Sequence, residues 1–225
     1  MSAATAATAA ARTAGPSGAT RRGRVAARLY DPFLALGERR GMAGRRRELL
    51  AAAHGRTLEL GAGTGLNLAA YPDGLDQLVL TEPEPGMQRL LRRRVERPPL
   101  RGIAQVVSAG AEALPFADDS FDTVVATLVL CTVDDPRAAV AEAHRVLRPG
   151  GRLLFIEHVR ADDAGLARRQ DRLERPWQAF GGGCRCNRRT LALLDERFAR
   201  TESRTAVWRG MPRIVHPLVV GEAIA

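Results

Sequence analysis

The sequence predicts an α/β fold, in which a mostly parallel, doubly wound sheet carries helices on both faces. Short apolar runs typical of buried strands alternate along the chain with amphipathic helical patterns. Residues 123–133 (T-V-V-A-T-L-V-L-C-T-V) are apolar almost throughout, as a strand covered on both faces requires. A glycine-rich turn follows the first strand, and sheets of this kind bind ligands at such turns.

The composition is that of one globular domain. The chain has 225 residues, 45% of them hydrophobic, which is enough for a proper core. The positive side of its net charge of +9 comes from arginine alone, because the sequence contains no lysine. These arginines are scattered along the chain, so we expect no nucleic-acid partner. Three cysteines without a paired framework indicate a reduced, cytoplasmic setting. The sequence shows neither a secretory signal nor an apolar run of about 20 residues, so no membrane anchor is predicted.

The predicted elements follow in the order that a doubly wound sheet requires. Residues 1–20 are Ala/Thr-rich and are expected to be a disordered tail. Residues 21–54 predict a helical cap, interrupted at Asp31-Pro32 and at Gly37, Gly41 and Gly44. In the main domain, 55–225, strands are predicted at 58–60, 77–81, 103–107, 123–133 and 152–157, and helices at 66–71, 87–96, 136–147 and 191–198. The last two strands, 202–208 and 217–224, are expected to form an antiparallel pair.

The spacing of the glycine turn distinguishes between cofactors. Gly61, Gly63 and Gly65 alternate, so the third glycine comes one residue earlier than in the G-x-G-x-x-G fingerprint of dinucleotide-binding proteins. The chain also lacks a G-x-x-x-x-G-K-[ST] phosphate loop. With Glu59 the pattern reads E-x-G-x-G-x-G, which resembles the first motif of class I S-adenosylmethionine (SAM) dependent methyltransferases. A nicotinamide-dependent dehydrogenase is a minor alternative.

Later motifs strengthen this resemblance. Glu82 ends the strand at 77–81 and lies 21 residues after Gly61, where an acid is placed to hydrogen-bond the two ribose hydroxyls. The runs S-A-G-A-E-A-L-P-F (108–116) and L-R-P-G-G (147–151) resemble further motifs of the same class. Many of its members carry an Asp that receives the adenine amino group where this chain has Gly110.

The resemblance implies a Rossmann-like, seven-stranded sheet, mostly parallel with an antiparallel last strand, and SAM as the cofactor. Met87 is expected to pack on the adenine face or to fill the core, and backbone groups near Gly110, or Glu112, to recognise adenine. The predicted cofactor-binding residues are Glu59, Gly61, Ala62, Gly63, Thr64, Gly65, Asn67, Glu82, Pro83, Met87, Gly110, Ala111, Glu112 and Leu128.

Residues from about 55 onward resemble a narrower family, the alkyl-thiol methyltransferases of animal endoplasmic reticulum and related bacterial small-molecule and lipid methyltransferases. The runs A-T-L-V-L-C-T-V (126–133), R-V-L-R-P-G-G (145–151) and I-E-H-V (156–159), with the segment 183–190, carry this resemblance. It implies methyl transfer to a small-molecule acceptor, with a thiol as the first expectation. The alternatives are O- or N-methylation of a small natural product or phospholipid, and a non-catalytic SAM-binding protein. The hydrophobic anchor of the animal members is not carried over.

The acceptor is expected at the carboxyl end of the strand 152–157, beside an insertion at 160–200. His158 is the candidate general base, because an imidazole titrates near neutrality; a hydrogen bond that caps the strand end is its structural alternative. The predicted acceptor side also includes Tyr30, Cys131, Cys184 and Cys186. Tyr30 would belong either to a lid over the site or to an arm docked on the core. No metal site is predicted, because Cys184 and Cys186 lack the usual two-residue spacing and a second pair. The oligomeric state is left open.

Overall fold

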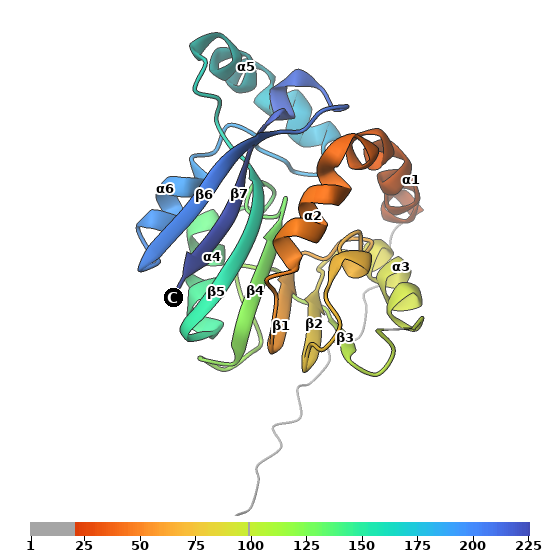
Figure 1. The fold of residues 1–225 in the computed structure, drawn as a ribbon. Helices are drawn as coiled ribbons and strands as arrows, with labels where there is room; N and C mark the ends of the chain where they lie inside the picture. Colours follow the sequence, from red (N-terminus) through yellow and green to blue (C-terminus); the bar gives the residue numbers. More distant parts are fainter. Residues whose placement is uncertain (1–20, 99) are drawn as a thin grey trace, which may run out of the picture.

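The protein is built on one seven-stranded sheet. The computed structural model describes residues 21–98 and 100–225, so the predicted tail, 1–20, lies outside the described residues. The strand order is β3-β2-β1-β4-β5-β7-β6 (Figure 1). β7 is antiparallel to both β5 and β6, so its direction is opposite to that of the other strands in the sheet. The strands are β1 Arg56–Leu60, β2 Gln77–Thr81, β3 Ala104–Val107, β4 Phe121–Thr127, β5 Leu147–His158, β6 Arg200–Val207 and β7 Pro217–Ile224. The predicted fold class is confirmed.

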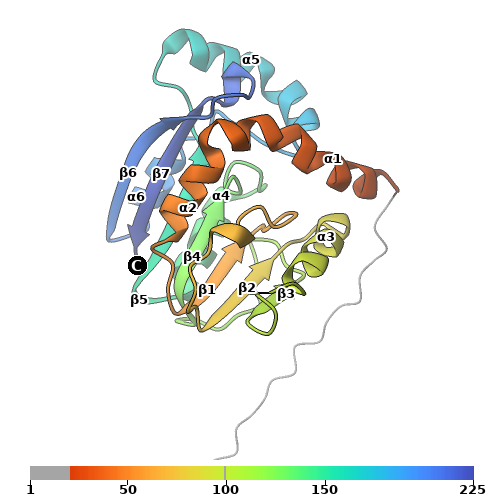
Figure 2. The same cartoon turned by 45° about the vertical axis from the view of Figure 1, so that its right-hand side comes forward.

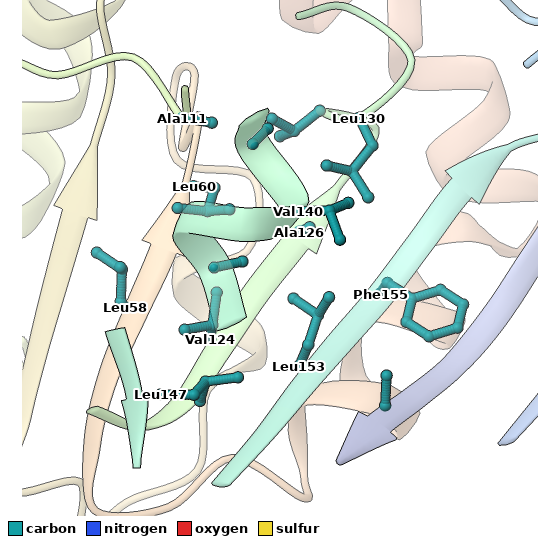
Figure 3. Packing of buried hydrophobic residues seen from close by; sticks show 14 of the residues in the cluster. Leu58, Leu60, Ala111, Val124, Ala126, Leu130, Val140, Leu147, Leu153 and Phe155 are labelled. Atoms are coloured by element: carbon teal, nitrogen blue, oxygen red, sulfur yellow. The ribbon is translucent and has the colours of Figure 1, made fainter. Parts of the chain in front are cut away.

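Helices cover both faces of the sheet because successive strand residues point to opposite sides. On one face, Leu58, Val124 and Leu153 pack with side chains of α4 and α6 (Figure 3). On the other face, Leu78, Val125 and Leu154 pack with side chains of α2 and α3. The α-helices are α1 Arg21–Gly37, α2 Ala43–Leu50, α3 Pro85–Val95, α4 Pro136–Val146, α5 Ala164–Phe180 and α6 Thr190–Asp195, with short helices at Glu38–Met42, Leu68–Ala70 and Arg213–Val215.

The chain reverses its direction of travel across the sheet at β1. From β1 it moves outward to β2 and β3, and it then returns to place β4 on the other side of β1. In open α/β sheets a crevice forms at such a switch point, outside the carboxyl ends of the strands. Figures 1 and 2 show α1 and α5 beyond that end of the parallel strands.

The N-terminal helices differ in part from the prediction. The chain does break at Gly41, which has a φ of +127° that favours glycine, and α1 ends at Gly37. The predicted interruptions at Asp31-Pro32 and Gly44 are wrong, because Pro32 lies inside α1 and Gly44 inside α2. Pro32 costs α1 one backbone hydrogen bond, while the side chains of Thr64 and Arg94 donate to the Asp31 carboxylate in the same turn.

The helix predicted at 66–71 is also wrong. After the glycine turn the chain forms only a short 3₁₀ helix, Leu68–Ala70. The segment is bounded by Gly65 and Pro72, and Tyr71 before the proline is extended at φ −68° and ψ 141°. The glycine turn therefore offers its own backbone N–H groups, without the N-terminus of a long helix behind it.

The fourth strand is shorter than its apolar run. β4 ends at Thr127, because Leu128 has a φ of +59°, which a strand cannot accommodate. Leu128 still donates its N–H to the carbonyl of Ile156 in β5 at 2.8 Å. The apolar residues that follow form a buried loop rather than a strand.

The C-terminal part contains the predicted insertion and the last strands. Residues 160–200 hold α5, α6 and the loop between them, and the predicted helix 191–198 is α6 at Thr190–Asp195. β6 and β7 form the predicted antiparallel pair, and β7 also pairs with β5 from Arg152 to His158. Among the described residues, no helix has the length and apolar character needed to cross a membrane.

Candidate active site

The three glycines of the turn after β1 have different neighbours. All three have positive φ, at +54°, +57° and +91°. A Cβ on Gly61 would lie 2.9 Å from the Val129 side chain, and one on Gly65 would lie 2.7 Å from Leu68. A Cβ on Gly63 would meet only the Gly61 carbonyl, at 4.0 Å. Gly61 and Gly65 therefore allow neighbouring side chains to pack closely against the turn, whereas the face of the turn at Gly63 is open to a ligand.

Glu82 ends the neighbouring strand and points back at this turn. Its Oε2 accepts the N–H of Gly63 at 2.8 Å, and its Oε1 accepts the N–H of Glu84 at 2.8 Å. Burial raises the pKa of the carboxyl, and the two N–H donors oppose that shift. Each carboxylate oxygen keeps a lone pair free, so Glu82 can accept two further hydrogen bonds.

Glu59 is bonded to residues that follow the glycine turn. Its carboxylate accepts Asn67 Nδ2 at 2.9 Å and the Tyr71 hydroxyl at 2.7 Å, and Asn67 Oδ1 accepts Arg46 Nη1 at 2.7 Å. Burial raises the pKa of Glu59 to about 7, although the bonds from Tyr71 and Asn67 act against this. The sequence singled out Glu59 and Asn67 but not Arg46, because Arg46 and its partner Asn67 are 21 positions apart in the chain.

The predicted adenine side is formed around Gly110. Its backbone lies beside the Glu112 side chain, whose Oε2 would be 3.2 Å from a Cβ at position 110. Glu112 Oε1 accepts the N–H of Asp134 at 2.9 Å, which fixes the direction of the carboxylate. Ala111 is buried, Met87 is half-buried near the start of α3, and Pro83 is exposed.

Helix α1 is tied down on the glycine turn. Asp31 accepts the Thr64 hydroxyl at 2.5 Å and also Arg94 of α3, which in turn donates to the Thr64 carbonyl at 2.8 Å. The adjacent Tyr30 has a pKa raised to about 12, chiefly by burial and against the charge of Arg46, with Cys131 and Glu82 among the groups that add to the shift. Tyr30 is half-buried and packs against the hydrophobic cluster that contains Trp208 and Ile156. Asp31 and Arg94 were not predicted.

The loop after β4 is held by one buried carboxylate. Glu157 Oε1 accepts the N–H groups of Val129 and Leu130 at 2.8 and 2.9 Å, and its Oε2 accepts that of Cys131 at 3.3 Å. Burial raises the pKa of Glu157 to about 7, against the effect of these donors. Leu128, which opens the loop, keeps a backbone conformation that is unfavourable for a residue with a side chain. Sequence reasoning gave Glu157 no such role.

A cluster of sulfur and imidazole groups lies at the carboxyl end of the sheet. His158 Nδ1 is 3.4 Å from Cys131 Sγ and 3.4 Å from Cys184 Sγ. The ring stacks on Trp208 with centroids 5.4 Å apart, and its Nε2 is buried without a hydrogen-bond partner among the residues that the structure describes. The Cys131 thiol and, after it, His158 lower the pKa of Cys184, while the bond to Cys184 and burial raise the pKa of Cys131.

The loop that carries Cys184 is anchored on the loop after β4. Arg185 donates its backbone N–H to the Cys131 carbonyl at 2.7 Å. The Arg188 guanidinium donates to the carbonyls of Leu130 at 2.5 Å and Val133 at 2.7 Å. Cys186 is buried in the same loop but outside the cluster, and burial raises its pKa to about 12. The structure thus unites Cys131, His158 and Cys184 and leaves Cys186 aside.

The residues around the glycine turn fit SAM. The open face of Gly63 allows close approach of a ligand, and Glu82 beside it has lone pairs for two hydroxyls. The predicted adenine end has the backbone at Gly110 and the Glu112 carboxylate, which the Asp134 N–H holds in place. Two open hollows of about 590 and 640 Å³ lie elsewhere on the surface, around Arg56 and around Arg160, and none of the predicted site residues lines either one.

The chain is similar to known methyltransferases. The family described as "Methyltransferase domain" matches residues 58–155. Thiol S-methyltransferase TMT1B of Rattus norvegicus is 36% identical over 172 residues, which are 74% of this chain and 69% of that protein. Phosphatidylethanolamine N-methyltransferase of Cereibacter sphaeroides is 36% identical over 50% of this chain and 55% of its own length.

A solved structure shows the same fold. It comes from Thermotoga maritima and is described as a SAM-dependent methyltransferase, possible histamine N-methyltransferase. The TM-score is 0.66 at 21% identity, with 89% of this chain and 97% of that chain covered.

Proposed function

We propose a thiol acceptor for this chain, which belongs to the family of S-adenosylmethionine-dependent methyltransferases. The observation that carries the proposal is the cluster of Cys131, His158 and Cys184 at the carboxyl ends of β4 and β5. The similarity to a thiol S-methyltransferase over 74% of the chain supports it. The reaction would move one methyl group from SAM to the sulfur of a small molecule.

The cofactor supplies a methyl group on a sulfonium, which needs an acceptor held in line and kept from water. Glu82 is placed to accept the ribose hydroxyls, because Gly63 and Glu84 orient its carboxylate. Glu59 acts through Asn67, whose position fixes the turn, so we assign it a positioning role. Gly110, Glu112 and Met87 remain our candidates for the adenine contacts.

The acceptor would lie between Tyr30 and the sulfur–imidazole cluster. Free thiols have a pKa of about 8.5, so a fraction is already thiolate near neutral pH and modest assistance suffices. His158 Nδ1 faces two sulfurs, and only Nε2 is left to act as a base on the acceptor. The proposed acceptor contacts are thus Tyr30, Cys131, His158 and Cys184, without Cys186.

One surface feature favours a second candidate, a phospholipid acceptor. Apolar side chains of α1 and α5 are exposed beside each other, with Phe33 and Phe180 in edge-to-face contact at 5.4 Å. Leu29, Leu36, Leu173 and Phe180 are 41–69% exposed, and such a surface could meet a lipid. The similarity to a phosphatidylethanolamine N-methyltransferase covers half of the chain.

An acceptor panel separates these functions. The purified protein would be incubated with SAM and matched small thiols, phenols and amines, and with phosphatidylethanolamine vesicles, and the products identified by mass spectrometry. We expect a gain of one methylene in mass on thiols alone. If the methyl group is instead transferred to a phenol, an amine or the lipid, that compound is the acceptor and the thiol proposal is wrong. SAM binding without a methylated product on any thiol would also contradict the proposal.

A further inference from the structure

Three side chains that bind soft metals meet where β4 and β5 end. Cys131 lies in the loop after β4, His158 is the last residue of β5, and Cys184 lies in the loop between α5 and α6. Both sulfurs are 3.4 Å from the same nitrogen, His158 Nδ1, and the three donor atoms lie within 4.8 Å of one another. All three side chains are buried, with exposed fractions of 0%, 4% and 5%.

These distances fit a metal site. In a tetrahedral zinc site, bonds of about 2.3 Å to sulfur and about 2.0 Å to nitrogen separate the two kinds of donor by about 3.5 Å. The observed separation of 3.4 Å is close to this value for both cysteines at once. A cation would also give three buried polar groups a charged partner in place of the weak sulfur–imidazole bonds between them.

We propose that Cys131 Sγ, His158 Nδ1 and Cys184 Sγ bind a divalent cation of the zinc type. Two thiolates and an imidazole are the ligands that zinc prefers, and two thiolates neutralise its charge in a buried place. Three protein ligands leave one tetrahedral position for water or for another donor. The metal site stands on its own geometry and does not depend on the proposed function. A metal on Nδ1 would keep a proton on Nε2, so the metal-bound protein would use His158 as a ligand and not as a base.

The surrounding structure already holds the ligands in position. Glu157 binds the N–H of Cys131, and the N–H of Arg185, next to Cys184, donates to the Cys131 carbonyl at 2.7 Å. Arg188 ties the same two loops together through the carbonyls of Leu130 and Val133. A metal would therefore enter a site whose two cysteine loops are fixed relative to each other, which lowers the cost of ordering them.

Cys186 provides a matched control. It is a buried cysteine in the same loop as Cys184, two residues further on, and it takes no part in the cluster. A Cys186→Ser variant loses a thiol of the same burial without losing a proposed ligand. It therefore separates metal ligation from any general effect of cysteine loss in this loop.

The test is metal binding by the full chain, purified without a histidine tag and treated with a chelator. Co²⁺ and then Zn²⁺ would be titrated in the presence of a reductant that is not a thiol, with absorption and elemental analysis as readouts. We expect one metal per chain and a thiolate-to-cobalt charge-transfer band that Zn²⁺ abolishes. Cys186→Ser should behave like the wild type, whereas Cys131→Ser, Cys184→Ser and His158→Ala should each bind at least tenfold more weakly.

The absence of a charge-transfer band in the wild type would overturn the proposal, whatever the variants do. Equal loss of binding in Cys186→Ser and Cys184→Ser would overturn it as well. Thermal melting of each variant establishes that it is folded, and the wild-type titration decides the question if one variant is not. Because thiol methylation is judged by the methylated product, a negative metal result leaves the proposed function standing.

Discussion

Glu82 Oε2 accepts the backbone N–H of Gly63 at 2.8 Å, and this bond joins the acid at the end of β2 to the glycine turn after β1. The second oxygen of the same carboxylate takes the N–H of Glu84. The Glu82 side chain and the glycine turn are therefore already ordered before a ligand binds. A cofactor that meets the open face of Gly63 therefore meets a carboxylate already aimed beside it.

Replacing Glu82 by Ala should lower the affinity for SAM about a hundredfold or more. The change removes hydrogen bonds to an ionised acceptor, each contributing about 1.5–3 kcal/mol, and leaves the Gly63 N–H unpaired. Glu82→Gln keeps one acceptor oxygen and should lose less. Calorimetric titration with SAM measures both values, and an unchanged affinity in Glu82→Ala would remove this residue from the cofactor site.

Gly63→Ala should weaken SAM binding at least tenfold, because its Cβ would occupy the open face of the turn. The matched control is Gly74→Ala, since Gly74 also has positive φ, at +87°, and open space around it. Both changes should cost about 1–2 kcal/mol of unfolding free energy through backbone strain. Only Gly63→Ala should lose affinity for SAM; equal affinities in the two variants would contradict the assignment.

The stability of the protein should fall as pH rises from about 4.5 to about 7, in part through Glu59. Burial raises its folded-state pKa to about 7 from an ordinary value of 4.5, so the folded state holds this proton more tightly than the unfolded state. The contribution is present below pH 4.5 and lost as pH passes 7, by about 3 kcal/mol. Glu59→Gln cannot titrate at this position and should lack this pH-dependent contribution to the free energy of unfolding.

Urea unfolding of the wild type and Glu59→Gln at pH 5 and pH 8 checks this prediction. Other acids, Glu157 among them, titrate in both proteins and cancel in the comparison. The variant should gain stability relative to the wild type at the higher pH. Parallel pH profiles for the two proteins would show that Glu59 is ionised in the folded state at low pH as well.

The sheet could be predicted from the sequence because its signals are local. β2 and the pair β6 and β7 lie within two residues of the predicted ranges, since apolar runs bounded by turn residues define them. Glu82 and the glycines could be placed because each directly follows a strand or forms its turn. These features depend on neighbours in the chain, which a sequence shows.

The parts that failed depend on contacts between distant residues. β4 ends early because Leu128 has positive φ and Glu157, far along the chain, takes the next N–H groups. Cys131, His158 and Cys184 were predicted on the same acceptor side, but the contact of both sulfurs with one imidazole nitrogen could not be predicted, because these residues lie on separate loops and a strand end. No periodic pattern in the sequence marks such meetings.

His158→Ala should reduce turnover about a hundredfold while SAM affinity stays within about threefold of the wild type. His158 lies in the sulfur–imidazole cluster, and neither ring nitrogen bonds to the glycine turn. His144→Ala is the matched control, because His144 of α4 packs on Phe198 away from the site. Steady-state kinetics and SAM titrations give both quantities. An unchanged kcat would exclude His158 from the reaction.

The thiol acceptor is tested most directly with SAM that carries a carbon-13 methyl group and with acceptors that offer two nucleophiles in one molecule. Mercaptoethanol presents a thiol and a hydroxyl, and cysteamine presents a thiol and an amine, so access and size are equal for each pair. The carbon chemical shift of the product identifies the atom that received the methyl. We predict an S-methyl signal alone from both compounds; an O-methyl or N-methyl signal, or no labelled product from a protein that binds SAM, would contradict the account.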